Sequence, residues 1–227
     1  NMLGRIGDSV KGKSCVVSGS GNVATYAAEK ILQLGGKVLT LSDSGGFVHD
    51  PDGINEEKLE FIKNLKQVQR GRISEYTDTY KNATFHEGRP WGVTCDVALP
   101  CATQNEITEA EAKLLLANGV KVVSEGANMP TEQGGIDAFI DGKILFAPSK
   151  AANAGGVAVS GLEMSQNSAR ISWKEDELQV LLQDIMKSIH DNCVEYGSEG
   201  EHVNYLKGAN VAGFIKVADA MVAYGVV

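Results

Sequence analysis

The chain has 227 residues, 43% of them hydrophobic, which is enough for one large domain with a substantial core. Its formal net charge of −8 argues against nucleic acid or an anionic membrane as a main partner. No apolar run reaches the roughly 18 residues of a membrane span, and no signal-peptide layout opens the chain. The four cysteines and four histidines show no metal-binding spacing, so we expect free buried thiols, no metal site and a cytoplasmic protein.

The first predicted elements form a strand, a glycine-rich turn and a helix. Ser14–Val17 is a short apolar run with a β-branched pair, typical of a buried parallel strand. The G-x-G-x-x-A pattern that follows places Gly19 in the tight turn, Gly21 where a backbone can approach a pyrophosphate, and Ala24 where the helix packs on the strand. A helix over residues 23–34 would direct its free N–H groups at that diphosphate. An ordinary glycine-rich turn is the alternative, but this order of elements favours dinucleotide binding.

The second predicted strand, Lys37–Ser42, ends at Asp43, about where a ribose-binding acid belongs in a dinucleotide-binding fold. A Pro-Asp-Gly sequence over residues 51–53 predicts a small hairpin excursion with its turn there. Asn55 can then cap a helix over residues 56–68 with a narrow apolar face.

Four further strands and three helices are predicted. A capping box at Thr108 starts a helix to Asn118. The adjacent Gly134 and Gly135 indicate a surface turn, because two glycines weaken a helix by about 1 kcal/mol each. From residue 157 onward the chain reads as helical. The strands are expected at 83–86, 96–99, 120–124 and 144–147, and the late helices at 175–196, with a core-facing apolar stripe, and 209–224.

The alternation of strand and helix predicts an α/β fold with a doubly wound, mostly parallel sheet, Rossmann-like, followed by additional C-terminal helices. Ligands bind such sheets beyond the carboxyl ends of the strands. Five loops are therefore expected to converge on one crevice, at residues 19–22, 43–44, 101–104, 125–128 and 150–153.

Several of these loops carry long phrases that closely resemble the hexameric glutamate dehydrogenases and their leucine, phenylalanine and valine relatives. The phrases are LPCATQN from Leu99, EGANMPT from Glu125, KAANAGGV from Lys150, SGLEMSQN from Ser160 and GANVAGF from Gly208. The resemblance runs from about residue 12 to residue 227. It covers only the C-terminal, dinucleotide-binding domain of that family.

The resemblance implies a role for each matching residue. Ala102, Thr103 and Gln104 match the loop along the nicotinamide-side ribose and ring, Asn128 the residue on that ribose, and Asn153 one near the nicotinamide. Val157 and Ser160 match positions that line the glutamate pocket, where the hydroxyl contacts the side-chain carboxylate; a small helix-packing residue is the alternative for Ser160. The full set of expected coenzyme-binding residues is Gly19, Ser20, Gly21, Asn22, Val23, Asp43, Ser44, Lys66, Arg72, Ala102, Thr103, Gln104, Asn128 and Asn153.

The resemblance also implies what this chain lacks. The family's catalytic Lys and Asp belong to the first domain, and no G-G-G-K-G segment is present here. Lys150 lies beside the coenzyme loop and is left out of catalysis. We therefore expect residues 1–227 to form one dinucleotide-binding domain, with a core over 12–156 and a helical part over 157–227, cut from a longer protein. The isolated chain is expected to bind coenzyme without turnover and to be monomeric or weakly associated, whereas the whole enzyme would be a homohexamer.

The coenzyme is expected to be NADP, with NAD as the alternative. Asp43 taken alone favours NAD, because a carboxylate repels a 2′-phosphate. Ser42-Asp43-Ser44 resembles the NADP-dependent branch of the family, in which Ser44 and basic groups matching Lys66 and Arg72 would meet the phosphate. Those two charges could equally form a solvated helix face.

The implied reaction is the reversible oxidative deamination of L-glutamate to 2-oxoglutarate and ammonia. A methyltransferase is a weaker interpretation, since Val23 stands where its turn would carry glycine. A dehydrogenase of a branched-chain or aromatic amino acid shares the fold, but is expected to lack the hydroxyl at Ser160. A noncatalytic nucleotide-binding module is the interpretation from another class.

Overall fold

The structure is a computed structural model in which residues 1–225 are described. Its internal contacts divide the chain into two compact units. One is Leu3–Ser149, and the other is residues 150–225 together with Asn1–Met2. The predicted assignment of both parts to one dinucleotide-binding domain stays a prediction.

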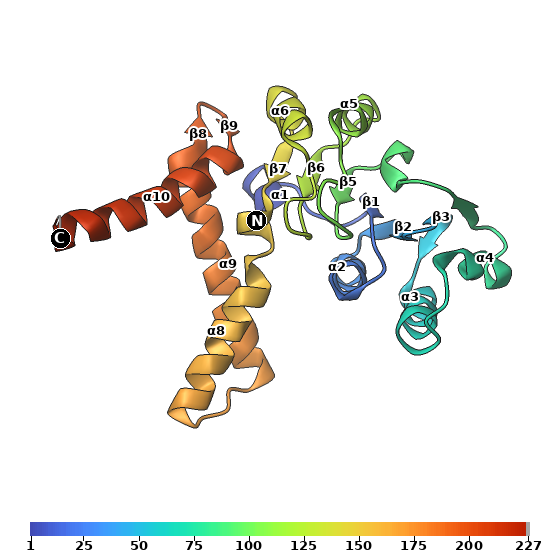
Figure 1. Cartoon of the computed structure of the whole chain (residues 1–227), viewed down its shortest axis with the longest axis horizontal. Coiled ribbons are helices and arrows are strands. Elements are labelled where there is room, and N and C mark those ends of the chain that lie inside the picture. The colour runs from blue at the N-terminus through green and yellow to red at the C-terminus, as the bar shows by residue number, and fades with distance from the viewer. Residues whose placement is uncertain (226–227) are drawn as a thin grey trace. The chain divides into compact units, whose positions relative to one another are not determined.

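The first unit is built on a seven-stranded sheet with the order β4-β3-β2-β1-β5-β6-β7 (Figure 1). The five strands β2, β1, β5, β6 and β7 are parallel, and β3 and β4 add an antiparallel edge. This mostly parallel sheet confirms the predicted α/β class. The strands are β1 Ser14–Val17, β2 Lys37–Asp43, β3 Gly46–Ile54, β4 Thr84–His86, β5 Val97–Leu99, β6 Val122–Ser124 and β7 Leu145–Ala147.

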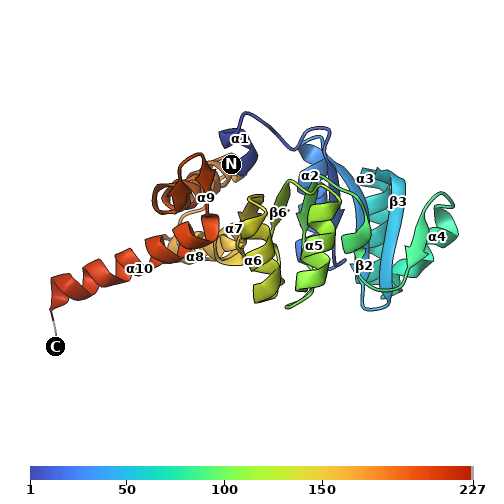
Figure 2. The same ribbon diagram turned by 90° about the horizontal axis from the view of Figure 1, so that it is seen from above.

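Helices cover both faces of this sheet. Figures 1 and 2 show α2 and α3 on one face and α5 and α6 on the opposite face. The core between α5, α6 and the sheet contains Leu115, Phe139 and Val123, all fully buried. Burying such apolar surface is the main stabilising contribution to a sheet of this kind. The helices of the unit are α1 Met2–Arg5, α2 Asn22–Gln33, α3 Glu56–Lys63, α4 Tyr76–Thr79, α5 Glu109–Ala117 and α6 Gln133–Asp141.

Local capping signals place two of these helices. The side chain of Asn55 accepts a hydrogen bond from Lys58 N and starts α3. Thr108 and Glu111 form the predicted capping box at the start of α5, each side chain accepting from the other's backbone N–H.

The hairpin predicted around residues 51–53 is wrong. β3 is one continuous strand, Gly46–Ile54, and the chain reverses earlier, where Asp43 pairs with Gly46. The register between β2 and β3 shifts from Thr40↔His49 to Val38↔Ile54, so the Pro-Asp-Gly sequence forms a bulge within the strand. A bulge accommodates proline and a left-handed glycine, Gly53 at φ +90°, without ending the pairing.

The helix predicted over residues 56–68 changes character midway. α3 ends at Lys63, and Asn64–Val68 continues as a π-helical turn in which Gln69 N donates to Asn64 O over 3.0 Å. The predicted apolar face is confirmed, since Leu59, Ile62 and Leu65 are buried.

The surface turn predicted at Gln133-Gly134-Gly135 is also wrong, because these residues begin α6. A Cβ at Gly135 would lie 2.8 Å from Thr131 Cγ2, and one at Gly134 would lie 3.0 Å from Glu109 Oε2. The glycines therefore allow α6 to pack closely against the start of α5, and that packing outweighs their weak helix propensity.

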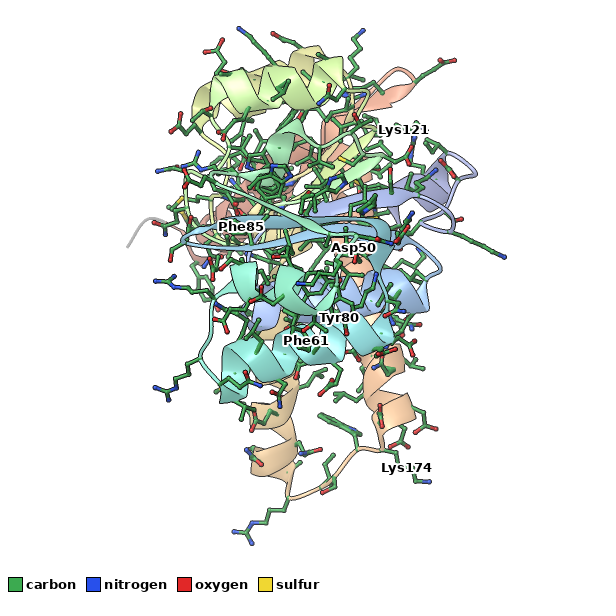
Figure 3. All side chains as sticks on the ribbon, turned by 90° about the vertical axis from the view of Figure 1, so that its right-hand side faces the viewer. Asp50, Phe61, Tyr80, Phe85, Lys121 and Lys174 are labelled. Carbon is green, nitrogen blue, oxygen red and sulfur yellow. The ribbon has the colours of Figure 1, made fainter. Side chains whose placement is uncertain are left out.

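A buried polar cluster supports the antiparallel edge of the sheet. Asp50 of β3 is fully buried and accepts hydrogen bonds from Lys58 Nζ over 2.7 Å and from the Tyr76 hydroxyl over 2.6 Å. Figure 3 labels Asp50, Tyr80 and Phe61; the rings of Tyr80 and Phe61 meet edge to face at 5.4 Å. Because a buried carboxylate needs partners, this cluster fixes how α3 and α4 lie against β3.

The second unit is mainly helical. α9 and α10 pack closely, since a Cβ at Gly208 would clash with the backbone of Cys193. The predicted apolar stripe on α9 is half-buried and ends at the buried Cys193. The last helix begins at Tyr205, four residues earlier than predicted, because Asn204 caps it by accepting from Lys207 N. The elements are α7 Ser149–Ala152, which starts at the end of the first unit, α8 Ala154–Ala169, α9 Glu175–Gly197, β8 Ser198–Glu199, β9 His202–Val203 and α10 Tyr205–Tyr224.

No helix within residues 1–225 combines the length and the apolar character needed to cross a membrane.

The four cysteines are all buried and unpaired, as expected from their spacing.

Candidate functional site

A cavity of about 650 Å³ opens at the carboxyl ends of β1, β2 and β5. Three of the five predicted loops contribute to it, those at residues 19–22, 43–44 and 101–104. This is the edge of a parallel sheet where ligands bind. The predicted site residues that line it are Gly19, Ser20, Gly21, Asn22, Val23, Asp43, Ser44, Ala102 and Thr103.

The glycine-rich turn has two glycines, Gly19 and Gly21, with different surroundings. Gly19 has φ +86°, and a Cβ there would lie 3.0 Å from Cys101 O, so only glycine fits between the two loops. Gly19 N donates to Ser42 Oγ over 2.6 Å, which fixes the turn against β2. Gly21 is the N-cap of α2 and has no side-chain cap. A Cβ at Gly21 would meet no protein atom within 4 Å, so the space beside it is open to a ligand.

The acid at the end of β2 is already bonded on both oxygens. Asp43 Oδ1 accepts from Gly45 N over 2.9 Å, and Oδ2 accepts from Lys66 Nζ over 2.8 Å and Ile73 N over 2.9 Å. Burial acts to raise the pKa of Asp43, but these bonds outweigh it and hold the pKa below its usual value. The carboxylate is therefore ionised and paired with Lys66.

The two predicted basic residues, Lys66 and Arg72, do not line the cavity themselves, but each hydrogen bonds a residue that does. Lys66 comes from the π-helical turn and bonds Gly71 O as well as Asp43. Arg72 is exposed, and its Nη1 donates to Ser44 Oγ over 2.8 Å. Two positive charges, Lys66 and Arg72, thus stand at this corner of the cavity with two carboxylates, those of Asp43 and of Glu75, which accepts from Arg72 N over 2.6 Å.

The loop after β5 is held from behind by a buried acid. Glu106 is 3% exposed, and its Oε1 accepts from Ala102 N over 3.0 Å and from Thr103 N over 3.4 Å. Burial raises the pKa of Glu106, although its hydrogen bonds and the charge of Arg89 oppose that shift. Ser18 Oγ accepts from Cys101 N over 2.9 Å, so β1 and this loop are tied together directly.

Sequence reasoning missed part of the lining. Gly88, Arg89 and Pro90 form a wall of the cavity, and Glu106 also lines it. Arg89 pairs with Glu111 of α5 over 3.0 Å. Arg89 and Glu106 lie far in sequence from the glycine-rich turn, and no spacing rule points to them.

The loop after β6 packs behind the lining without joining it. Gly126 N and Ala127 N both donate to Pro100 O, and a Cβ at Gly126 would lie 2.6 Å from Cys101 Sγ. Glu125 is buried, and its Oε2 accepts from Ser149 N over 2.7 Å. Asn128 is exposed, and neither it nor Gln104 lines the cavity.

Comparisons with known proteins agree with this geometry. The model of the glutamate/leucine/phenylalanine/valine dehydrogenase family matches residues 1–225. The chain belongs to this family. It is 60% identical, over its whole length, to an NAD(P)-specific glutamate dehydrogenase of Xylanibacter ruminicola, and 54% identical over 99% of its length to an NADP-specific glutamate dehydrogenase of Haemophilus influenzae. It covers 51% of each of these two proteins.

Solved structures of the family give the same result. All of this chain superposes on 49% of a Plasmodium falciparum glutamate dehydrogenase with a TM-score of 0.94 and 44% sequence identity. The chain therefore spans about half the length of the family members it matches.

The remaining predicted residues lie in the second unit. Asn153 is half-buried directly before α8, and Val157 and Ser160 are exposed on that helix. Lys150 Nζ donates to Asn210 Oδ1 over 2.6 Å within the same unit. Coenzyme or glutamate contacts by these residues stay predictions.

Among residues 1–225, no group of three or more His, Cys, Asp and Glu side chains is arranged to hold a metal ion.

Proposed function

We propose that this chain is the coenzyme-binding part of a glutamate dehydrogenase. The whole protein would catalyse the reversible oxidative deamination of L-glutamate to 2-oxoglutarate and ammonia. Family membership and the names of the relatives support this proposal. The observation that carries it is the cavity at the carboxyl ends of β1, β2 and β5. At this cavity α2 begins without a side-chain cap, and the space beside its N-cap residue, Gly21, is open.

The residues present fit a nicotinamide dinucleotide. The N–H groups at the start of α2 would bind its pyrophosphate, because no side chain caps them and they lie at the positive end of the helix dipole. Ala102 and Thr103 would lie along the nicotinamide-side ribose. The bound nicotinamide supplies hydride acceptance, and the protein supplies binding and orientation. These residues would hold the ring at the distance that hydride transfer requires.

NADP is the favoured coenzyme, with NAD as the alternative. A lone carboxylate at Asp43 would repel a 2′-phosphate, but its pairing with Lys66 removes most of that repulsion. Arg72, which bonds Ser44 at the cavity wall, would meet the 2′-phosphate with its guanidinium. The relatives' names support both coenzymes, since one is NAD(P)-specific and the other NADP-specific.

The rest of the protein would complete the enzyme. Ser160 would contact the side-chain carboxylate of glutamate, and the catalytic acid–base groups would come from the first domain. We propose a homohexamer for the whole protein and a cytoplasmic location, in which the four free thiols would remain reduced.

Binding of coenzyme by this chain is the first test. The Cβ that Gly21→Val adds would have no protein atom within 4 Å, so the change should leave the fold intact and block the pyrophosphate. Isothermal titration calorimetry should show NADP binding to the wild-type chain and at least about tenfold weaker binding to the variant. Gly213→Val is the matched control, since Gly213 also faces open space, on exposed helix α10. Absence of binding by the folded wild-type chain would refute the proposal.

Turnover separates the whole enzyme from this part of it. The chain alone should not reduce 2-oxoglutarate with ammonia and NADPH, whereas the full-length protein should. Turnover by the chain alone would mean that the catalytic groups lie within these 227 residues.

A further inference from the structure

Glu106 is the one buried acid in the lining of the cavity, within the part of the chain that the structure describes. It follows β5 by seven residues and precedes α5. A carboxyl group at 3% exposure costs stability unless it is well bonded, so its retention at this position calls for an explanation. Its backbone carbonyl accepts from Trp91 Nε1 over 2.9 Å, which fixes the residue itself.

The side chain of Glu106 organises the loop in front of it. The N–H groups of Ala102 and Thr103 donate to Oε1, so both are already bonded within the protein. The loop therefore presents other atoms of these residues to a ligand. A carboxylate accepts such hydrogen bonds more strongly than a neutral group, because its charge assists them.

The same side chain connects the loop to the glycine-rich turn. Ser18, directly after β1, accepts from Cys101 N, and its hydroxyl acts to lower the pKa of the Glu106 carboxyl. The next residue, Gly19, is so close to the loop that an added Cβ would lie 3.2 Å from Ala102 Cα. A shift of residues 101–103 would therefore change the shape of the cavity at the turn.

We propose that Glu106 is a positioning residue for coenzyme binding: its carboxyl group holds the loop Cys101–Thr103 in the conformation that the coenzyme requires. This inference rests on the proposed function. Glu106 acts through the backbone N–H groups of Ala102 and Thr103.

The proposal has a pH signature. Protonation of Glu106 removes the negative charge that holds the two N–H groups, so coenzyme affinity should fall as the pH falls through the raised pKa of this carboxyl. Two other charged or titratable groups face it, Arg89 and Cys101. Burial raises the pKa of the Cys101 thiol to about 12, so this thiol does not titrate in that range.

The test uses Glu106→Gln in the 227-residue chain, which keeps the shape and one acceptor but removes the charge. Calorimetry from pH 5 to 8 should show NADP affinity reduced about tenfold at neutral pH, because a charge-assisted hydrogen bond becomes a neutral one. The difference between wild type and variant should shrink toward the acid end. That difference is the decisive readout, because the 2′-phosphate itself titrates near pH 6 in both proteins. Glu109→Gln is the matched control, since Glu109 is exposed, pairs with Lys113 and does not line the cavity.

The outcomes are distinct. If the wild-type chain binds neither NADP nor NAD, the proposed function fails before Glu106 is tested. If the wild type binds and folded Glu106→Gln binds equally well at every pH, this inference alone is wrong. If the variant does not fold, the wild-type chain provides the test. The NMR chemical shift of the Ala102 amide should change with pH as the Glu106 carboxyl titrates, and a shift that does not change with pH would overturn the proposal.

Discussion

Replacing Lys66 with methionine tests how the charge at the end of β2 selects the coenzyme. The change keeps most of the alkyl stem but leaves Asp43, 10% exposed at its side chain, without its ion-pair partner. At an effective dielectric constant of about 20, a unit charge about 5 Å from the carboxylate is repelled by about 3 kcal/mol. Solvent screening at this half-open corner reduces the effect to about 1.5–2 kcal/mol.

NADP should therefore bind Lys66→Met about 10- to 30-fold more weakly than it binds wild type. NAD has no 2′-phosphate, so its dissociation constant should change by less than about threefold. Calorimetry with both coenzymes gives the two values on one preparation. Lys63→Met is the control. Lys63 lies about one turn before Lys66, pairs with Glu29 and does not bond a cavity residue. Equal weakening of NADP and NAD, or no weakening of NADP, would refute the placement of the 2′-phosphate beside Asp43.

Two further predictions concern Ser160 and Asp96. In the full-length enzyme, Ser160→Ala should lower kcat/KM for glutamate by about tens-fold, because a hydrogen bond to a charged group is lost, while calorimetry shows unchanged coenzyme affinity. A parallel loss of coenzyme affinity would make Ser160 a packing residue. The hydrogen bond from Lys121 and those from Ser14 lower the pKa of Asp96 to about 2, so this carboxylate stabilises the fold above about pH 4 and loses that contribution as the pH falls toward 2. Urea unfolding should accordingly show a stability deficit of Asp96→Asn that narrows from pH 5 to pH 2; a constant deficit would contradict it.

The features predicted correctly from sequence depend on neighbouring residues. The glycine-rich turn is recognisable because Gly19, Gly21 and Ala24 serve one strand-to-helix junction. The cap of Thr108 and the alternation that predicts the sheet are equally local. Such signals need no knowledge of which distant segments meet, and the structure confirms them.

The features missed depend on contacts between distant segments. The bond from Cys101 N to Ser18 joins residues 83 positions apart, and the role of Glu106 appears only when β1 and β5 are adjacent. Gly134 and Gly135 read as a turn from propensity, but close packing of α6 against α5 decides their conformation. Likewise, β3 stays continuous through Pro51 because β2 tolerates the bulge opposite it. Tertiary packing overrides local preference at each of these places.

The π-helical turn at Asn64–Val68 makes the corner beside Asp43 sensitive to chain length. Such a turn contains one residue more than an α-helical turn, so deleting a single residue there would restore an ordinary α-helix. Every later residue of the helix would then rotate by about 100° relative to α3. The bond from Lys66 to Gly71 O and the approach of Arg72 to Ser44 both depend on the present register. A one-residue change in length, with no change of any charged side chain, would thus separate both cations from the end of β2.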